Sequence, residues 1–151
     1  MPKIVTFLMF NDQAEEAMKF YTSIFKNSKI TSTLPGPDGK VMGGTFTLDG
    51  KEFSCYNGGS YFSFAEGMSI YVECNTQADI DYYWDAFSAG AQKQVCGWIK
   101  DKFGVSWQFV PSILNQLLFD KDSQKAKRTM DAMLEMEKLD IQKLKDAHAG
   151  R

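Results

Sequence analysis

The order of apolar and polar residues predicts a strand followed by a helix at the start of the chain. Lys3 to Phe10 reads KIVTFLMF, a run apolar on both faces, so we expect a strand covered on both sides. Asp12 with Glu15 three residues later resembles a capping box at a helix start. Apolar residues then recur three and four apart, which places them on one helix face: Ala14, Ala17, Met18, Tyr21, Ile24 and Phe25.

Three further strands are expected before residue 57. Lys29 to Leu34 reads as a strand that ends at the turn-rich segment PGPDGK. Val41 to Leu48 and Lys51 to Tyr56 flank the dipeptide Asp49-Gly50, which is typical of a two-residue hairpin turn. The segment NGGSYFSFAEG then forms a glycine-bearing connector.

The same order of elements begins again after the connector. Met68 to Cys74 reads as a strand, and the helix that follows is expected to be capped by Thr76. The stretch CGWIKDKFGVSWQFVP predicts a second hairpin, with strands near Cys96 to Lys100 and Val105 to Val110 around the turn DKFG.

A short repeat relates the two halves. NDQAE at Asn11 and NTQAD at Asn75 share Asn, Gln and Ala in register, and each follows a strand and opens a helix. Each half also ends in a hairpin whose last strand begins after a glycine, Gly50 or Gly104. The repeat therefore predicts an internal duplication of a strand–helix–strand–hairpin unit.

The rest of the chain predicts a helical tail. Residues 111–118 read as a short helix with Pro111 at its start, and Asp140 is expected to cap the last helix. Between them, Ala126, Met130, Met133 and Leu134 share one helix face and are expected to fill a core or an interface. We therefore expect one α+β domain over residues 1–151, with module one at about 1–60, module two at about 67–111 and the tail at about 112–148.

Charge and cysteine content narrow the function classes. The net charge is −2, so the chain has no general basic field for a nucleic-acid backbone, and no nucleic-acid partner is expected. No apolar run approaches the length of a spanning helix, so no membrane partner is expected. The three cysteines are odd in number and lack a C-x-x-C spacing, which indicates free thiols and a cytoplasmic protein.

Few residues are candidates for covalent chemistry. Cys96 needs a base or a cationic neighbour to act as a nucleophile, and Lys100 lies four residues further along the expected strand, too far away. The only histidine, His148, is expected to be a solvated residue of a frayed tail. We therefore interpret Cys96 as a small buried apolar residue, and the sequence identifies no catalytic residue.

The two tryptophans of the second hairpin leave two interpretations open. Trp98 and Trp107 flank the turn on paired strands, where an indole serves either as core or as the wall of a cavity. Gln108 alternates with Trp107, so the two side chains face opposite ways, and Trp107 packs on the helix layer if Gln108 points into a curled sheet. The face of Trp98 depends on the strand register.

Several segments together resemble a known family. FYTSIF, SIYVECNTQADIDYYWD, CGWIKDKFGVSWQFVP and MDAMLEMEKLDIQKL resemble the PhnB-like family, over the chain from its first strand to about Leu144. This family belongs to the vicinal-oxygen-chelate superfamily of glyoxalases, extradiol dioxygenases and bleomycin-resistance proteins, and its members are often labelled 3-demethylubiquinone-9 3-methyltransferase. The resemblance implies two βαβββ modules, each curling its sheet around a cavity, and a homodimer.

The resemblance also implies positions for metal ligands. Metal-dependent members of the superfamily use His, Glu or Gln from the first and last strands of each module. The matching positions here are Ser54 and Gln108 in the last strands and, to within one residue, Thr6 and Ser69 in the first strands. Hydroxyls and one neutral amide are weak ligands for divalent first-row metals, so we expect neither a metal nor a cofactor.

The sequence and the resemblance leave three possible functions. The first is a metal-free binding module that holds a small organic ligand in an aromatic cavity, and its candidate residues are Thr6, Ser54, Ser69, Trp98, Trp107 and Gln108. The second is an enzyme, either of the lyase or dioxygenase type or the labelled methyltransferase, although the first strand is not followed by a glycine-rich cofactor loop. The third is a structural or interaction protein whose cavity is filled by its phenylalanines.

Overall fold

The computed structural model describes all residues from 1 to 151, and the chain divides into two compact units. Met1–Ser63 forms the first unit, and Phe64–Arg151 forms the second, which holds module two together with the tail. None of the helices combines the length and the apolar character that a membrane span requires. Each unit is described by itself below.

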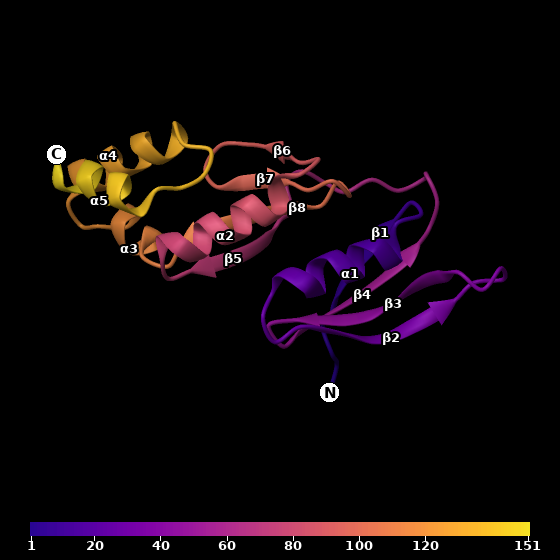
Figure 1. Cartoon of the computed structure of the whole chain (residues 1–151). Coiled ribbons are helices and arrows are strands. Elements are labelled where there is room, and N and C mark those ends of the chain that lie inside the picture. Colours follow the sequence, from indigo (N-terminus) through magenta and orange to yellow (C-terminus); the bar gives the residue numbers. More distant parts are fainter. The chain divides into compact units, whose positions relative to one another are not determined.

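Module one is a four-stranded sheet with one helix on one of its faces (Figure 1). Its strand order is β1-β4-β3-β2, with β1 parallel to β4 and the other neighbours antiparallel. The elements are β1 (Thr6–Phe10), α1 (Ala14–Ile24), β2 (Lys29–Pro35), β3 (Val41–Leu48) and β4 (Lys51–Asn57). The hairpin predicted around Asp49-Gly50 is confirmed, and both residues have the positive φ that such a tight turn requires.

The core of module one lies between α1 and the sheet. Tyr21 of α1 stacks on Phe46 with a centroid distance of 6.2 Å, and Phe46 stacks on Phe53 at 5.2 Å. The residues expected on the inner helix face are buried, which confirms the helical pattern. The strand expected to be covered on both sides is not, because Phe7 on its other face is 54% exposed.

The helix start predicted for α1 was wrong in its details. The residue before the helix is Gln13, whose side chain makes no capping hydrogen bond. The backbone N–H of Ala14 instead donates to Asn57 Oδ1 at 2.8 Å. A side chain 43 residues away in the sequence therefore satisfies this helix end, where we expected Asp12 and Glu15 to do so.

Module two repeats the topology of module one. Its strand order is β5-β8-β7-β6, which places the strands as in module one and confirms the predicted duplication. Thr76 caps α2, as predicted, because its hydroxyl accepts a hydrogen bond from the Asp79 backbone N–H. The elements are β5 (Ile70–Cys74), α2 (Gln77–Ser88), β6 (Gln92–Lys93), β7 (Trp98–Lys100) and β8 (Ser106–Pro111).

Three tail helices complete the second unit: α3 (Leu114–Leu118), α4 (Ser123–Leu134) and α5 (Ile141–Ala149). Asp140 caps α5 as predicted. Pro111 ends β8, however, and does not begin a helix. Of the face expected on α4, Met133 packs against an apolar cluster of this unit, whereas Met130 and Leu134 are 40% and 52% exposed and Thr129 is buried, so only part of that face belongs to the core.

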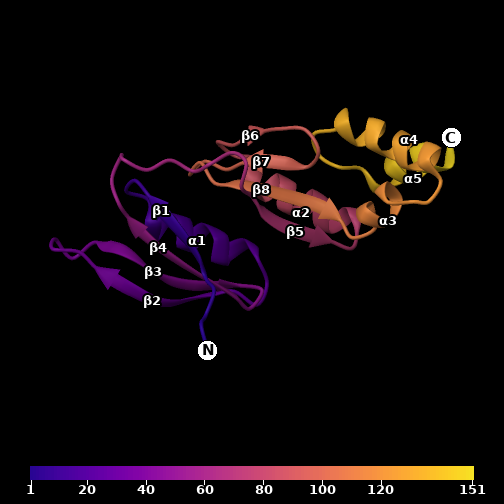
Figure 2. The ribbon, with the colours of Figure 1, turned by 180° about the vertical axis from the view of Figure 1, so that it is seen from behind.

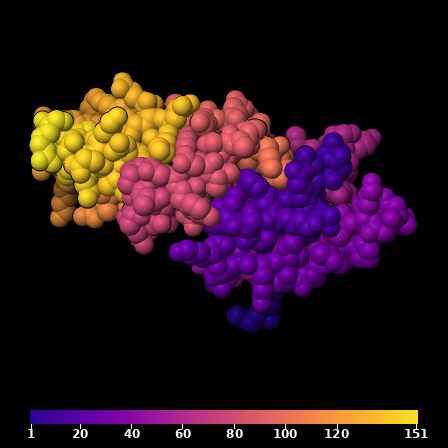
Figure 3. Space-filling model, in the orientation of Figure 1, coloured from indigo at the N-terminus to yellow at the C-terminus, as the bar shows by residue number.

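The tail lies against module two in the space-filling view (Figure 3). A small apolar cluster and backbone hydrogen bonds hold the two together. The cluster joins the buried side chains of Val110, Leu114, Leu139 and Leu144. The backbone N–H groups of Cys96 and Gly97 donate to the carbonyls of Met136 and Glu137 at 2.7 and 2.8 Å. The CG dipeptide of the sequence motif is therefore the place where the tail docks.

Candidate functional site

The alternation of side chains along β8 decides which residues face away from the helix. Trp107 and Phe109 both pack on Phe87 of α2, with ring centroids 4.8 and 5.2 Å from it. Gln108 lies between them in the strand, so its side chain points to the opposite face of the sheet. Figure 2 shows module two from the side on which the strands lie in front of α2. Of the two interpretations left open for Trp107, the structure supports the core, because its side chain is fully buried against the helix layer and does not line a cavity.

The strand register places an aromatic residue on each side of Gln108. Trp98 pairs with Gln108 across β7 and β8, and Tyr71 pairs with Gln108 across β5 and β8. Paired residues lie on the same face of a sheet, about 4.8 Å apart from strand to strand. Tyr71, Gln108 and Trp98 therefore form one row on the face opposite α2, which we call the amide row. The register also settles the face of Trp98.

A hydrogen bond ties Ser69 to the amide row. Gln108 Nε2 donates to Ser69 Oγ at 2.7 Å, and Ser69 lies just before β5. A glutamine amide has two N–H donors and an acceptor oxygen, and a serine hydroxyl both donates and accepts. One Gln108 N–H, its Oε1 and the Ser69 hydroxyl hydrogen are therefore left without a protein partner.

The aromatic members of the row keep polar atoms as well. Neither the indole N–H of Trp98 nor the hydroxyl of Tyr71 has a hydrogen-bond partner within the protein. Burial, and then the negative charge of Glu73, raises the pKa of the Tyr71 hydroxyl above its ordinary value. The phenol is therefore protonated at neutral pH, and every polar group of the row is uncharged.

Charged and apolar contacts bound this face at its two ends. At one end Lys100, which follows Trp98 in β7, forms an ion pair of 3.0 Å with Glu66. At the other end Val110 is buried in the cluster with the tail. Glu73 lies beside Val110 on β5, is exposed to water and contributes to the raised pKa of Tyr71 through its negative charge. The centre of the face is thus neutral.

The candidate residues of module one lie on different faces of their sheet. Ser54 pairs with both Phe7 and Thr45, on the face away from α1. Thr6 pairs with Phe53, which belongs to the core beneath α1, so Thr6 has the orientation of that face and is exposed at its edge. The structure therefore separates Thr6 from Ser54 and places Phe7 beside Ser54.

Trp107 belongs to the core, and its polar atom is satisfied by a residue that the sequence did not single out. Its indole Nε1 donates to Asp101 Oδ2 at 2.9 Å, and Asp101 is only 4% exposed. Asp101 Oδ1 also accepts from the backbone N–H groups of Phe103 and Val105 at 2.9 and 3.0 Å. A buried indole N–H needs a hydrogen-bond acceptor. This need is the signal that could have pointed to Asp101, which lies six residues before Trp107, across a tight turn.

The cysteines lack the environment of nucleophiles. Burial raises the pKa of Cys55 and of Cys74 to about 11, and it also raises the pKa of Cys96. Cys96 does not lie in a strand as expected, because it adopts a left-handed backbone with a φ of 63° just before β7. All three thiols are therefore protonated at neutral pH and poorly reactive.

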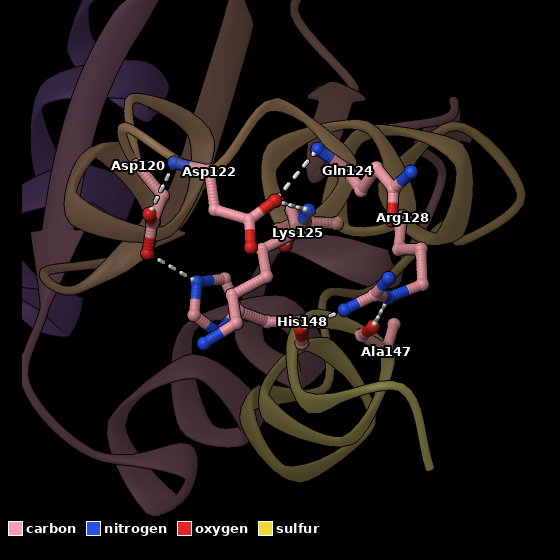
Figure 4. Close-up of polar contacts among 8 residues, drawn as sticks. Asp120, Asp122, Gln124, Lys125, Arg128, Ala147 and His148 are labelled. Atoms are coloured by element: carbon pink, nitrogen blue, oxygen red, sulfur yellow. Dashed lines mark hydrogen bonds and ion pairs between the residues drawn. The ribbon is translucent and has the colours of Figure 1, made fainter.

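His148 is an ordered part of the tail, which corrects the expectation of a solvated residue (Figure 4). Its Nε2 lies 2.8 Å from Asp120 Oδ2, and its side chain is 19% exposed. A hydrogen bond from the Asp122 backbone N–H, and then one from His148, lowers the pKa of Asp120. Arg128 donates to the carbonyls of Ala147 and His148, so this cluster closes the end of α5.

Two cavities lie elsewhere in the molecule. One of about 420 Å³ lies between α2 and the tail around Gln77, Asp81 and Lys138. The other, of about 680 Å³, lies in module one at the start of α1 and includes Asp12 and Lys40. Neither contains any of the six candidate residues, so the amide row is a half-open sheet face and not the wall of either cavity.

The donor atoms at the positions matched to superfamily metal ligands do not fit a divalent metal. Ser69 and Gln108 offer a hydroxyl and a neutral amide that are bonded to each other, and Thr6 faces away from Ser54. No group of three or more His, Cys, Asp or Glu side chains in the chain is arranged to hold a metal ion. Neutral oxygens alone compensate poorly for the water ligands that a first-row metal loses on binding.

Comparisons with known proteins give the following similarities. A family model described as 3-demethylubiquinone-9 3-methyltransferase matches residues 2–110. A solved structure from Bacillus cereus, named for the same activity and as PhnB protein, is 38% identical with a TM-score of 0.69, and the match covers 74% of this chain and 100% of that chain. No curated protein matches the chain.

Two more distant structures share the fold. A Pseudomonas aeruginosa protein is 20% identical with a TM-score of 0.60, and the match covers 74% of this chain and 98% of that chain. A genomically encoded fosfomycin resistance protein from Listeria monocytogenes is 13% identical with a TM-score of 0.58, covering 76% of this chain and 94% of that one. At this level of identity the similarity concerns architecture alone.

Proposed function

Because this chain belongs to the PhnB-like family of the vicinal-oxygen-chelate superfamily, the family described as 3-demethylubiquinone-9 3-methyltransferase, we propose that it is a metal-free binding protein for a small organic ligand. The ligand lies on the amide row of module two. The observation that carries the proposal is the pairing of Gln108 with Ser69 between two aromatic side chains, with polar atoms left for a ligand.

The chemistry of the row supports binding more than catalysis. A general acid or base needs a titratable group near neutral pH, and the row offers an amide, a hydroxyl, an indole and a phenol of raised pKa. A covalent mechanism needs an activated nucleophile, and the cysteines have raised pKa values. Aromatic walls around a few placed hydrogen-bonding groups are typical of small-molecule sites.

Mass spectrometry of the native protein tests the proposal. Protein purified without added metal is expected to carry a discrete small molecule, and elemental analysis is expected to find no stoichiometric Zn, Ni, Fe or Mn. The same measurement on Gln108→Leu serves as control, because the loss of hydrogen bonding is expected to release the molecule. Protein that is consistently empty would favour a structural or interaction role, and a stoichiometric metal would contradict the metal-free proposal.

The methyltransferase activity of the family description is the second candidate, and the match over residues 2–110 is the observation in its favour. Methyltransferases that use S-adenosylmethionine commonly bind it at a glycine-rich loop after the first strand of a doubly wound parallel sheet. Here β1 leads into Asn11, Asp12 and Gln13, and the sheet is of the βαβββ type. Isothermal titration with S-adenosylmethionine decides between the two, since micromolar binding would favour the enzyme.

We further propose that the protein is a cytoplasmic homodimer. The free thiols of three cysteines suit a reducing compartment. The exposed apolar side chains of Met130 and Leu134, one turn apart on α4, support a second copy as a partner. Light scattering after gel filtration is expected to give twice the monomer mass, and Leu134→Glu is expected to shift the mass toward the monomer.

A further inference from the structure

We infer that the ligand of the amide row is an uncharged planar ring whose edge carries a hydrogen-bond acceptor beside a donor, as in an aromatic amide or lactam. This inference rests on the proposed binding function and names the class of its ligand. It follows from the row alone, namely Tyr71, Gln108 and Trp98 with Ser69 bonded at the centre.

The geometry of the row selects for shape. Gln108 occupies the central strand of three, and its neighbours on either side are the rings of Tyr71 and Trp98. The two aromatic side chains each lie one strand away from the central amide. This arrangement favours a planar ligand that contacts the aromatic rings and directs its edge toward the amide of Gln108. An aliphatic chain would gain the apolar contact but would leave the polar atoms of Gln108 and Ser69 unpaired.

The free polar atoms select for both a donor and an acceptor in the ligand. Gln108 keeps Oε1 as an acceptor and one N–H as a donor, and Ser69 keeps a hydroxyl hydrogen. The N–H of Trp98 and the hydroxyl of Tyr71 add further donors at the sides. A carbonyl next to an N–H satisfies the central amide in two directions at once, as amides pair with each other.

The charges select against ions. Lys100, two residues along β7 from Trp98, is paired with Glu66 at 3.0 Å and so is a poor partner for an anionic ligand. Glu73 is exposed at the far end of β5, where water screens its attraction for a cation. Covering a charged ligand on a neutral, partly buried row costs desolvation that no opposite charge offsets.

Three probes of the same shape and different charge test the inference. Benzamide, benzoate and benzamidinium are titrated into ¹⁵N-labelled protein while the side-chain amide of Gln108 and the indole N–H of Trp98 are followed by NMR. Benzamide is expected to move both signals with an affinity of about millimolar, as suits so small a ligand. Benzoate and benzamidinium are expected to bind at least about tenfold more weakly. The indole of Trp107, which is held by Asp101, is expected not to move.

Two variants of Gln108 and one control sharpen the test. Gln108→Leu is expected to weaken benzamide at least about fivefold, whereas Gln116→Leu on the exposed surface of α3 is expected to have no effect. Gln108→Glu keeps the shape and adds a negative charge, so it is expected to reverse the preference toward benzamidinium. The spectrum of each variant shows directly whether it has folded.

The outcomes separate this inference from the function on which it rests. If benzoate or benzamidinium binds the unaltered protein as well as benzamide does, the ligand class is wrong and the binding function stands. If no probe moves Gln108 or Trp98, the inference is overturned. The binding function then depends on the mass spectrometry of the native protein, which does not use these probes.

Discussion

Replacement of Asp101 is expected to destabilise the second unit more than any other change of a polar residue in the hairpin. Its buried carboxylate accepts hydrogen bonds from the backbone N–H groups of Phe103 and Val105 and from the indole of Trp107, at 2.9 to 3.0 Å. The side chain thus closes the turn and, through Trp107, fixes the ring that packs beneath α2.

The magnitude follows from these three bonds. A hydrogen bond to a charged acceptor contributes about 1.5–3 kcal/mol net, and bonds that share one carboxylate are not additive. Asp101→Ala is therefore expected to lower the free energy of unfolding by about 3–5 kcal/mol, a large part of the ~5–15 kcal/mol typical of a domain. Asp38→Asn is the control, because Asp38 is an exposed turn residue that accepts one backbone hydrogen bond, from Lys40.

A double-mutant cycle isolates the bond to the indole. Asp101→Asn keeps one oxygen for the backbone N–H groups but turns an NH₂ group toward the indole N–H, so two donors face each other. Trp107→Phe removes one of these donors, and the double variant is expected to be more stable than the sum of the single losses by about 1–2 kcal/mol. Urea unfolding followed by far-ultraviolet circular dichroism measures each variant. Additive losses, within about 0.5 kcal/mol, would refute the proposed role of the indole bond.

The remaining predictions concern the tail and its docking place. Gly97→Ala is expected to cost at least about 1 kcal/mol more than Gly39→Ala in urea unfolding, because both have a φ of 80° but only at Gly97 does an added Cβ come within 2.8 Å of a backbone carbonyl. Gln77→Ala is expected to speed hydrogen exchange at the Ile141 amide, whose N–H donates to Gln77 Oε1. The pKa of Asp120 is lowered in the folded protein, so its contribution is present above its ordinary value of 3.8 and lost as pH falls through the lower folded value. Asp120→Asn is accordingly expected to remove part of the acid-induced loss of stability in a pH series.

Helix caps and tight turns could be predicted from the sequence, because the residues that form them are close together in the chain. Thr76 caps α2 through an N–H three residues ahead, and Asp140 caps α5 in the same way. Asp49-Gly50 closes a hairpin with two positive φ angles that few other dipeptides adopt easily. Each of these contacts is complete within a few residues, so the pattern of the sequence contained it.

The first strand shows why the faces of the candidate residues could not all be predicted. KIVTFLMF is apolar at almost every position, so its pattern does not say which residues point toward the helix. A shift of one residue exchanges Thr6 for Phe7 on the open face, and the pairing of Phe7 with Ser54 decides this. The face of Trp98 likewise required its pairing with Gln108.

Contacts between distant segments account for the other differences. The N–H of Ala14 finds its acceptor at Asn57, on a strand that the helix start does not predict. The strand β6 consists of two polar residues whose pairing depends on β7. His148 was expected to be solvated because a lone histidine near the chain end carries no local signal for its partner Asp120, 28 residues earlier.

The closing hairpin explains why the most distinctive segment of the sequence identifies the family but not a reaction. Gly97 docks the tail, Asp101 organises the turn, and Trp107 fills the core, so most of the motif builds the fold. Because side chains alternate along β7 and β8, Trp98 and Gln108 point away from α2. They lie at the neutral centre of the opposite face of the sheet. Substitutions at the first set are expected to change stability, whereas those at the second are expected to change what binds and to leave the fold intact. The specificity of the ligand therefore resides in few positions, which the architectural residues of the motif hold in place.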